Sequence, residues 1–232
     1  MSKSHSVPNH DNTFPFQPSS PIPTFGIGRL PQPGPRIIVI GASTGGPQAL
    51  SIVLKGLGSA IELIPVVVVL HIPSEFTEVI ASHTKRATGL PAHAARHGEE
   101  VSKGHIYISP GHQHLGVLRF GDTPVVALSD DPPENFCKPS VDVLFRSAAK
   151  SYGEQVIGIV LTGMGCDGLA GSRAIAAAGG MIVAQNAASS TVWGMPRSVV
   201  NEGLAHAVLS VDMIGPTVSR LVHSYAACEK KS

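Results

Sequence analysis

The chain has 232 residues, a formal net charge of +1 and 43% hydrophobic residues, which suits one sizeable globular domain with a large core. Charged residues make up only 14%, so the composition argues against the broad basic surface of a nucleic-acid-binding protein and against an acidic tail. The longest apolar run, Val66–Leu70, is far shorter than the about 20 residues that span a bilayer, and no apolar signal core opens the chain, so we expect a cytoplasmic protein that is not embedded in a membrane.

Proline is concentrated in the first part of the chain. Residues 1–35 hold eight prolines among Ser, Asn and Gln, a composition that prevents both helices and sheet ladders and predicts a disordered or polyproline segment. From residue 36 onward, apolar runs alternate with amphipathic segments. We therefore expect a Pro-rich tail over residues 1–35, a folded domain over residues 36–225 and a flexible C-terminus over residues 226–232.

Continuous apolar runs in the folded part predict strands that are buried on both faces, and apolar residues at helical spacing predict helices between them. The predicted strands of the main sheet are residues 37–40, 66–70, 156–161, 181–184 and 205–209. The predicted helices are residues 47–57, residues 74–86 with Ser74 as N-cap, a segment capped by Ser140, an Ala-rich segment ending at Gly179, a segment after Pro196 and a last one from Asp212. Residues 106–108, 115–120 and 125–128 are separated by turn sequences and predict hairpins at the sheet edge.

The alternation of strands and helices predicts an α/β fold: a doubly wound, mostly parallel sheet with helices on both faces and an edge hairpin region. In such a sheet the carboxyl ends of the strands share one edge, where ligands bind. Three of the predicted strands are followed by Ser43, His71 and Asp167. A serine hydroxyl becomes a nucleophile when an imidazole accepts its proton, and a carboxylate orients that imidazole. The three residues therefore predict a nucleophilic site.

Each of these three residues also has a structural interpretation. Ser43 and Asp167 are residue types that often cap helices, and His71 suits a hydrogen-bonded position at a strand end. Only their joint placement after three strands favours the catalytic interpretation. The order Ser, His, Asp differs from the orders in three familiar hydrolase folds, which is acceptable because triads are defined by geometry.

The glycine-rich turn over residues 41–47 has two rival interpretations as a nucleotide-binding loop. Its glycines match the spacing of a P-loop, but Pro47 and Gln48 stand where the lysine and the hydroxyl residue are needed. The turn also lacks the glycine spacing of a dinucleotide-binding fingerprint. The sequence therefore disfavours nucleotide binding.

The eleven histidines and three cysteines form few metal-binding patterns. His112 and His114 would point the same way on a strand, but no third ligand follows at a useful spacing. Cys166 adjoins Asp167, yet it has no visible basic neighbour that would favour a thiolate nucleophile. The cysteine spacing indicates neither a disulfide framework nor a structural metal site, so we expect no bound metal.

Six segments of the chain carry a resemblance to one known family. They are Gly41–Pro47, His71–Pro73, Tyr107–Gly111, Pro139–Phe145, Leu161–Gly168 and Trp193–Pro196. In this order they resemble motifs of the catalytic domain of the chemotaxis protein-glutamate methylesterases (CheB-like), and the likeness extends over residues 36–222. Six blocks in order are far more specific than a single glycine-rich turn.

The resemblance implies hydrolysis of glutamate γ-methyl esters on the cytoplasmic helices of methyl-accepting chemotaxis receptors, with deamidation of glutamines as a second activity. It implies the triad Ser43, His71 and Asp167. It also places Thr44 and Met164 at the same site, with the Met164 backbone N–H as an oxyanion donor. Water is the second substrate in this chemistry, and no metal or organic cofactor is implied.

The sequence also departs from the family in places. Members usually carry an amino-terminal receiver domain that controls the esterase, and residues 1–35 are too few to form one. We therefore expect control by a separate partner, by another means, or no control at all. Residues 136–138 and 186–187 differ from the usual family residues. These departures leave two alternatives open: a non-catalytic domain that binds receptors or signalling partners, and a hydrolase of a different ester.

Overall fold

A computed structural model describes residues 34–229 of the protein, which contain one large parallel sheet. Its strands are β1 (Ile37–Ala42), β2 (Val66–Leu70), β3 (Ala92–Ala94), β4 (Ile106–Ile108), β7 (Val156–Val160), β8 (Met181–Gln185) and β9 (Ala207–Leu209). Their order across the sheet is β3-β4-β2-β1-β7-β8-β9, and all neighbours pair in parallel. The predicted α/β class with a mostly parallel sheet is confirmed.

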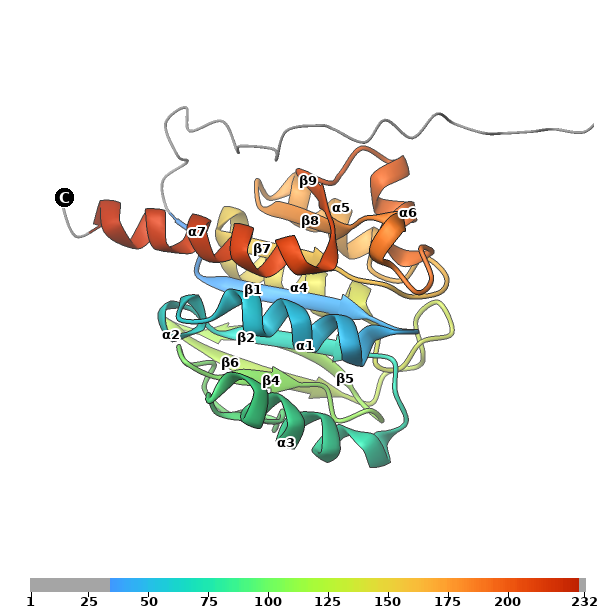
Figure 1. The fold of residues 1–232 in the computed structure, drawn as a ribbon. Helices are drawn as coiled ribbons and strands as arrows, with labels where there is room; N and C mark the ends of the chain where they lie inside the picture. Colours follow the sequence, from blue (N-terminus) through green and yellow to red (C-terminus); the bar gives the residue numbers. More distant parts are fainter. Residues whose placement is uncertain (1–33, 230–232) are drawn as a thin grey trace, which may run out of the picture.

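Helices cover both faces of the sheet (Figure 1). The α-helices are α1 (Gly46–Leu57), α2 (Ala60–Leu63), α3 (Thr77–Thr88), α4 (Val141–Tyr152), α5 (Leu169–Ala177), α6 (Met195–Asn201) and α7 (Val211–Glu229). In the view of Figure 1, α1 and α7 lie in front of the sheet and α4 lies behind it. The chain runs from β1 through β2 towards one edge, returns beside β1 at β7 and continues to the other edge, which makes the sheet doubly wound.

Alternate residues of the central strands face two separate hydrophobic clusters. Ile38 and Ile40 belong to the cluster that includes side chains of α1 and α7, whereas Ile37 and Val39 belong to the cluster that includes side chains of α4. All six residues of β1 are buried. A continuous run of branched apolar residues forms the central strand because neither of its faces meets water.

The hairpin region differs from the prediction in its placement. β5 (His114–Phe120) and β6 (Thr123–Ser129) pair in antiparallel fashion, but they form a separate two-stranded sheet instead of extending the main one. The first short strand, β4, pairs in parallel with β2 on one side and β3 on the other. Turn sequences therefore indicated the hairpin correctly but could not show that residues 106–108 belong to the parallel sheet.

Smaller differences concern helix starts and short elements. The helix predicted over residues 74–86 begins as a 3₁₀ turn at Ser74–Phe76, and α3 follows it. Ser140 stands at the N-cap position of α4, but its hydroxyl makes no capping hydrogen bond to that helix. Further 3₁₀ turns lie at Gly153–Gln155 and Ala187–Ser189. Neither α2 nor β3 follows from the sequence patterns.

The ends of the predicted domain lie close to the ends of the described range. The predicted tail falls outside the described residues except for Gly34 and Pro35. α7 continues to Glu229, so the boundary expected at residue 225 falls inside a helix, and residues 230–232 lie outside the described range. Within residues 34–229, no helix combines the length and the apolar character needed to cross a membrane.

Candidate active site

The three residues predicted to form a nucleophilic site follow three neighbouring strands. Ser43 follows β1, His71 follows β2 and Asp167 lies in the loop after β7, and β1 pairs with both of the other strands. The backbone N–H of Ser43 donates to the Thr162 carbonyl at 3.0 Å, and that of His71 donates to the Ala42 carbonyl at 3.0 Å. These two hydrogen bonds connect the carboxyl end of β1 to the ends of β7 and β2. The parallel topology therefore brings the three residues to one edge of the sheet.

His71 and Asp167 are in direct contact. The distance from His71 Nε2 to Asp167 Oδ2 is 2.8 Å, and the two side chains are 17% and 2% exposed. Because an ionised carboxylate can only accept, Nε2 is the donor, and in the neutral form of the imidazole Nδ1 is therefore the nitrogen without a proton. Nδ1 has no hydrogen-bond partner within residues 34–229 and is free to accept a proton.

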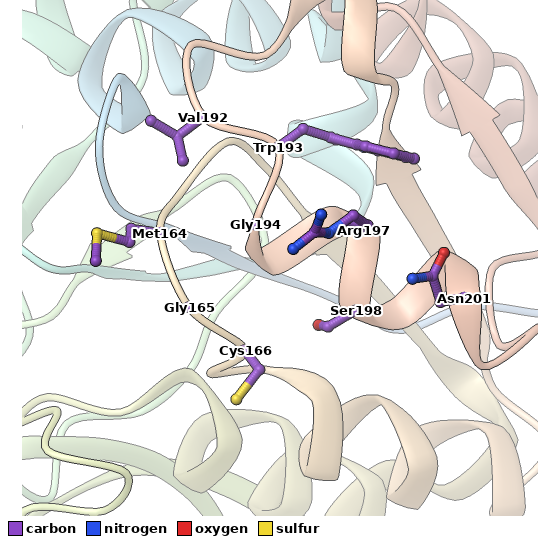
Figure 2. Close-up of a pocket in the computed structure, with 9 residues that line it drawn as sticks. All are labelled: Met164, Gly165, Cys166, Val192, Trp193, Gly194, Arg197, Ser198 and Asn201. Carbon is purple, nitrogen blue, oxygen red and sulfur yellow. The ribbon is translucent and has the colours of Figure 1, made fainter. Parts of the chain in front are cut away.

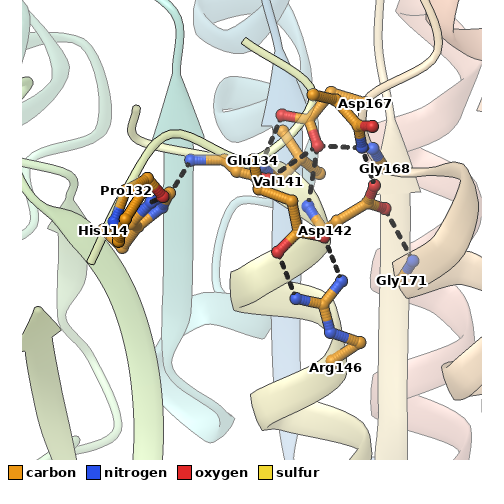
Figure 3. A network of polar contacts seen from close by, with 11 residues as sticks. His114, Pro132, Glu134, Val141, Asp142, Arg146, Asp167, Gly168 and Gly171 are labelled. Carbon is orange, nitrogen blue, oxygen red and sulfur yellow. Dashed lines mark hydrogen bonds and ion pairs between the residues drawn. The ribbon is translucent and has the colours of Figure 1, made fainter. Parts of the chain in front are cut away.

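Asp167 contacts His71 and is also held by the N-terminus of α4. Figure 3 shows the contacts with α4. Its carboxylate accepts hydrogen bonds from Ser140 Oγ (2.8 Å) and from the backbone N–H groups of Val141 (2.7 Å), Asp142 (3.0 Å) and Gly168 (3.0 Å). Asp167 therefore caps α4 from another segment of the chain. Burial raises the pKa of Asp167, but the hydrogen bonds from His71 and α4 outweigh it and lower this pKa below its ordinary value. The carboxylate is ionised at neutral pH.

A second buried carboxylate, Asp142, lies beside Asp167 and has the opposite pKa shift. Its side chain accepts from the Gly171 N–H of α5 at 2.6 Å and from Asn135 Nδ2 at 3.1 Å, and the residue is 1% exposed. Burial, with a smaller contribution from the charge of Asp167, raises the pKa of Asp142 to about 6. Asp142 thus links α4 to α5 and to the loop before α4.

Ser43 stands in the tight turn between β1 and α1. Gly45 has a φ of 77°, a left-handed conformation that glycine adopts without strain. A Cβ added to Gly163 would lie 2.8 Å from the Ser43 Cβ, so the segment after β7 passes directly against the serine. No hydrogen bond joins Ser43 Oγ to His71 or to any other group in the described part of the chain. In enzymes without substrate such bonds are often long and tighten only in the complex.

Thr44 lies in this turn and Met164 lies in the loop after β7, and both are exposed, Met164 by 75%. Neither of their backbone N–H groups has a hydrogen-bond partner within residues 34–229, whereas the N–H of Ser43 is already bonded to the Thr162 carbonyl. Unpaired N–H groups beside a nucleophile are suitable donors to an oxygen that gains negative charge. The Thr44 and Met164 N–H groups are therefore two candidate donors at this site.

A pocket of about 670 Å³ opens beside Met164 (Figure 2). It is lined by residues 164–166, 192–194, 197, 198 and 201. Arg197 is the one charged residue of this lining, and it makes no ion pair within residues 34–229. Figure 2 shows its side chain on α6, the helix that follows Gly194. A cation without a protein partner in a pocket favours a ligand with an acidic or polar group.

His112 and His114 do not form a joint metal site. His114 is buried, donates from Nε2 to the Pro132 carbonyl at 3.1 Å and accepts at Nδ1 from the Ser140 N–H at 3.2 Å. His112 is exposed and contacts the Pro110 carbonyl at 3.2 Å. His114 therefore connects β5 to the loop before α4 and to α4 itself, which is a structural role.

Cys137 is a neighbour of the site that no sequence pattern predicted. Its Sγ, a ring nitrogen of His71 and a carboxylate oxygen of Asp167 all lie within 4.8 Å of one another. The residue is half-buried, and burial, helped by the charges of Asp167 and Asp142, raises the pKa of Cys137 to about 11. Its thiol is protonated at neutral pH and is a poor nucleophile. Cys166, the alternative nucleophile, is exposed and lines the pocket beside Met164.

The fold and the site together define an α/β protein with a serine and a hydrogen-bonded histidine–aspartate pair at one edge of a parallel sheet. The chain belongs to the CheB methylesterase family, whose model matches residues 38–218. This match covers most of the described domain and agrees with the six motif segments.

Relatives and a solved structure agree with this assignment. A protein-glutamate methylesterase/protein-glutamine glutaminase of group 2 operon from Rhodopseudomonas palustris is 49% identical over 187 residues, which are 81% of this chain and 48% of that protein. A protein-glutamate methylesterase/protein-glutamine glutaminase 1 from Paramagnetospirillum magneticum is 43% identical over 210 residues, 88% of this chain and 55% of that protein. The chain thus spans about half the length of the curated relatives it matches. The crystal structure of the Thermotoga maritima CheB methylesterase catalytic domain has a TM-score of 0.77 and 35% identity, and the match covers 82% of this chain and 99% of that one.

Proposed function

We propose that the protein hydrolyses glutamate γ-methyl esters on methyl-accepting chemotaxis receptors, with deamidation of receptor glutamines as a second activity. The observation that carries this proposal is the hydrogen-bonded pair of His71 and Asp167 beside Ser43, in a chain of the CheB methylesterase family. The names of its relatives, protein-glutamate methylesterase/protein-glutamine glutaminase, support both activities.

Ser43 is the nucleophile and His71 the base of the proposed reaction. Nδ1 of His71 accepts the hydroxyl proton as Ser43 Oγ bonds to the ester carbonyl carbon, and the ionised Asp167 stabilises the imidazolium that forms. The carbonyl oxygen gains negative charge in this step. The backbone N–H groups of Thr44 and Met164 stabilise it, and removal of one such donor costs about 2.7–4 kcal/mol of activation free energy in comparable sites.

The leaving group and water complete the cycle. The bond between the carbonyl carbon and the methoxy oxygen breaks, and the imidazolium of His71 protonates that oxygen, so methanol leaves. A water molecule then gives a proton to His71 and attacks the acyl group on Ser43, which releases the glutamate carboxylate and restores the serine hydroxyl. With glutamine as substrate, ammonia leaves in place of methanol.

Exposed apolar side chains around the site support a protein as substrate. Phe76 is 53% exposed, Phe136 102% and Met164 75%, and they lie on the segments after β2, before α4 and after β7. Each of these segments also contributes to the site. Large apolar side chains left in water beside a site are typical of contact with another macromolecule. We place the protein in the cytoplasm because the receptor glutamates of this chemistry lie there.

The test is release of methanol from methyl-labelled receptor. Wild-type protein should release methanol, and Ser43→Ala should lower kcat by about 10³-fold or more. Its melting temperature should stay unchanged because the Ser43 hydroxyl makes no hydrogen bond within the described residues. Ser51→Ala, the same substitution on the neighbouring helix α1, is the matched control and should keep the wild-type rate.

Other outcomes identify other functions. Undiminished methanol release by Ser43→Ala would overturn the serine mechanism. Receptor binding without methanol release by the wild-type protein would identify a binding domain. Hydrolysis of small esters that depends on Ser43, with receptor esters left intact, would identify a hydrolase of a different substrate.

A further inference from the structure

Three different metal-ligating side chains lie together at the site: Cys137, His71 and Asp167. One ligand atom of each lies within 4.8 Å of the other two. In tetrahedral zinc sites, bonds of about 2.0–2.3 Å place neighbouring ligand atoms about 3.3–3.8 Å apart. Small side-chain movements would therefore bring this sulfur, nitrogen and oxygen around one ion.

We propose that Cys137, His71 and Asp167 form a binding site for a thiophilic divalent cation, with Zn²⁺ as the ion that fits best, and that the bound ion inhibits the enzyme. A mixed set of sulfur, nitrogen and oxygen is typical of zinc, whereas Mg²⁺ and Ca²⁺ prefer oxygen alone. Water would occupy the fourth position. Ion binding follows from the positions of these three side chains alone. Inhibition also rests on the proposed function, in which His71 is the base.

The hydrogen bonds of Asp167 determine where the ion fits. Within residues 34–229, Oδ1 accepts from three donors, whereas Oδ2 accepts only from His71 Nε2 and the Val141 N–H. An ion between Oδ2 and Nε2 takes the place of the proton that these two atoms share at 2.8 Å. The hydrogen bonds from α4 to Asp167 therefore remain when the ion binds.

Binding at Nε2 explains the inhibition. A neutral imidazole carries one ring proton, so an ion on Nε2 leaves that proton on Nδ1. Nδ1 is then a donor and cannot accept the hydroxyl proton of Ser43. The ion thus blocks the first step without touching the serine.

Cys137 is suited to ligation in both position and charge. Its Sγ has no hydrogen-bond partner within residues 34–229, and backbone hydrogen bonds with Glu134 at 2.8 and 3.1 Å hold the loop that carries it. The cation releases the thiol proton to solvent and binds the thiolate. One thiolate and one carboxylate balance the two charges of the ion, so the half-buried cluster becomes neutral.

The direct test is a titration of the chelator-treated full chain with Co²⁺ and then Zn²⁺. Thiolate bound to Co²⁺ gives a charge-transfer absorption band, which Zn²⁺ should remove by displacement. Wild-type protein should bind one ion, and so should Ser43→Ala, because Ser43 is not a ligand. Cys137→Ser should lose the band and bind Zn²⁺ at least about 100-fold more weakly, since even loss of a hydrogen bond to a ligand costs about 10–100-fold. Cys166→Ser is the matched control and should keep the band.

Inhibition is measured in the methanol-release assay. Zn²⁺ should inhibit wild-type protein and Cys166→Ser at the concentrations at which it binds, a chelator should restore activity, and Cys137→Ser should need at least about 100-fold more Zn²⁺. Thermal unfolding without metal checks that Cys137→Ser is folded. Independently of any variant, Zn²⁺ should protect Cys137 of the wild-type protein from alkylation.

Three outcomes would overturn the inference: no thiolate band in wild-type protein, a band that persists in Cys137→Ser, or a band that is lost in Cys166→Ser. They would leave the proposed esterase activity intact. Conversely, full activity of Ser43→Ala would overturn the proposed function while the metal titration remained valid.

Discussion

The two faces of the parallel sheet bury different kinds of side chain. On one face, the polar residues of helices α1, α3 and α7 that are buried within the described range are all threonines: Thr77, Thr84 and Thr217. On the opposite face, α4 and α5 bury Asp142 and Ser172, and the segments that lead into these helices bury Ser140 and Asp167. One face is therefore a conventional hydrophobic layer, and the other combines a hydrophobic cluster with the polar groups of the site.

This difference shows how the fold separates stability from chemistry. Apolar burial stabilises the first face and is non-directional, so it needs no donors or acceptors at fixed positions. A buried ionised group such as Asp167 is tolerated only because donors surround it, so its stability depends on the position of α4. Substitutions on the first face should change stability alone, and substitutions on the second should change stability and activity together.

The largest expected effect is that of Asp167→Asn on the polar face. The amide has the same shape, but it lacks the charge that holds His71 and caps α4. The kcat of the proposed reaction should therefore fall about 10⁴-fold, the loss that the same change causes in a known serine–histidine–aspartate triad. The melting temperature should fall as well, because the α4 N-terminus loses its counter-charge. Methanol release and thermal unfolding measure the two effects, and Ser43→Ala, which should lower activity alone, is the control. Wild-type activity in Asp167→Asn would contradict the role assigned to this carboxylate.

A pair of leucines compares the two faces directly. Leu54 of α1 is 1% exposed and Leu144 of α4 is 0% exposed. Each Leu→Ala change should lower the free energy of unfolding by about 2–5 kcal/mol, measured by urea unfolding. At a temperature where both variants are folded, Leu54→Ala should keep the wild-type kcat, whereas Leu144→Ala should lower it because α4 positions Asp167. Equal kcat values in the two variants would remove the distinction between the faces.

The smallest expected effect concerns Asp142 and depends on pH. Burial raises the pKa of Asp142 to about 6, so between about pH 4 and pH 6 the folded protein keeps a proton that the unfolded chain loses. The stability of wild-type protein relative to Asp142→Asn should therefore fall as pH rises through this window, by about 1–3 kcal/mol, and stay constant above it. Urea unfolding of both proteins from pH 4 to pH 8 measures this difference. A difference that does not vary with pH would show that Asp142 is ionised throughout.

The sequence predicts most of the fold because its strongest patterns are local. The apolar runs of β1, β2 and β7 have the composition of strands buried on both faces, and they occupy the centre of the sheet. In contrast, Ala92–Ala94 shows no apolar alternation and becomes a strand only by pairing with β4. The placement of the β5–β6 hairpin also depends on contacts between distant segments, which local patterns do not contain.

The same limit applies to the site. Ser43, His71 and Asp167 follow buried strands, so parallel topology predicts their common edge, and the contact between His71 and Asp167 agrees with it. Their catalytic roles remain predictions. Ser140 was predicted as a helix cap, but its hydroxyl donates to Asp167 instead, because α4 packs against the loop after β7. Cys137 reaches the site through the same packing, and no spacing in the sequence indicates it.

Asp167 contacts His71 and also accepts hydrogen bonds from the start of α4, and these two roles affect how the sequence can change during evolution. A descendant of this chain that lost the proposed esterase chemistry would still need an acceptor for the N–H groups at the start of α4, so the aspartate would persist. The hydroxyl of Ser43 has no such second task within the described residues and would be free to change. When related sequences are compared, a serine at position 43 should therefore distinguish active esterases from inactive homologues, whereas the aspartate at position 167 should be present in both.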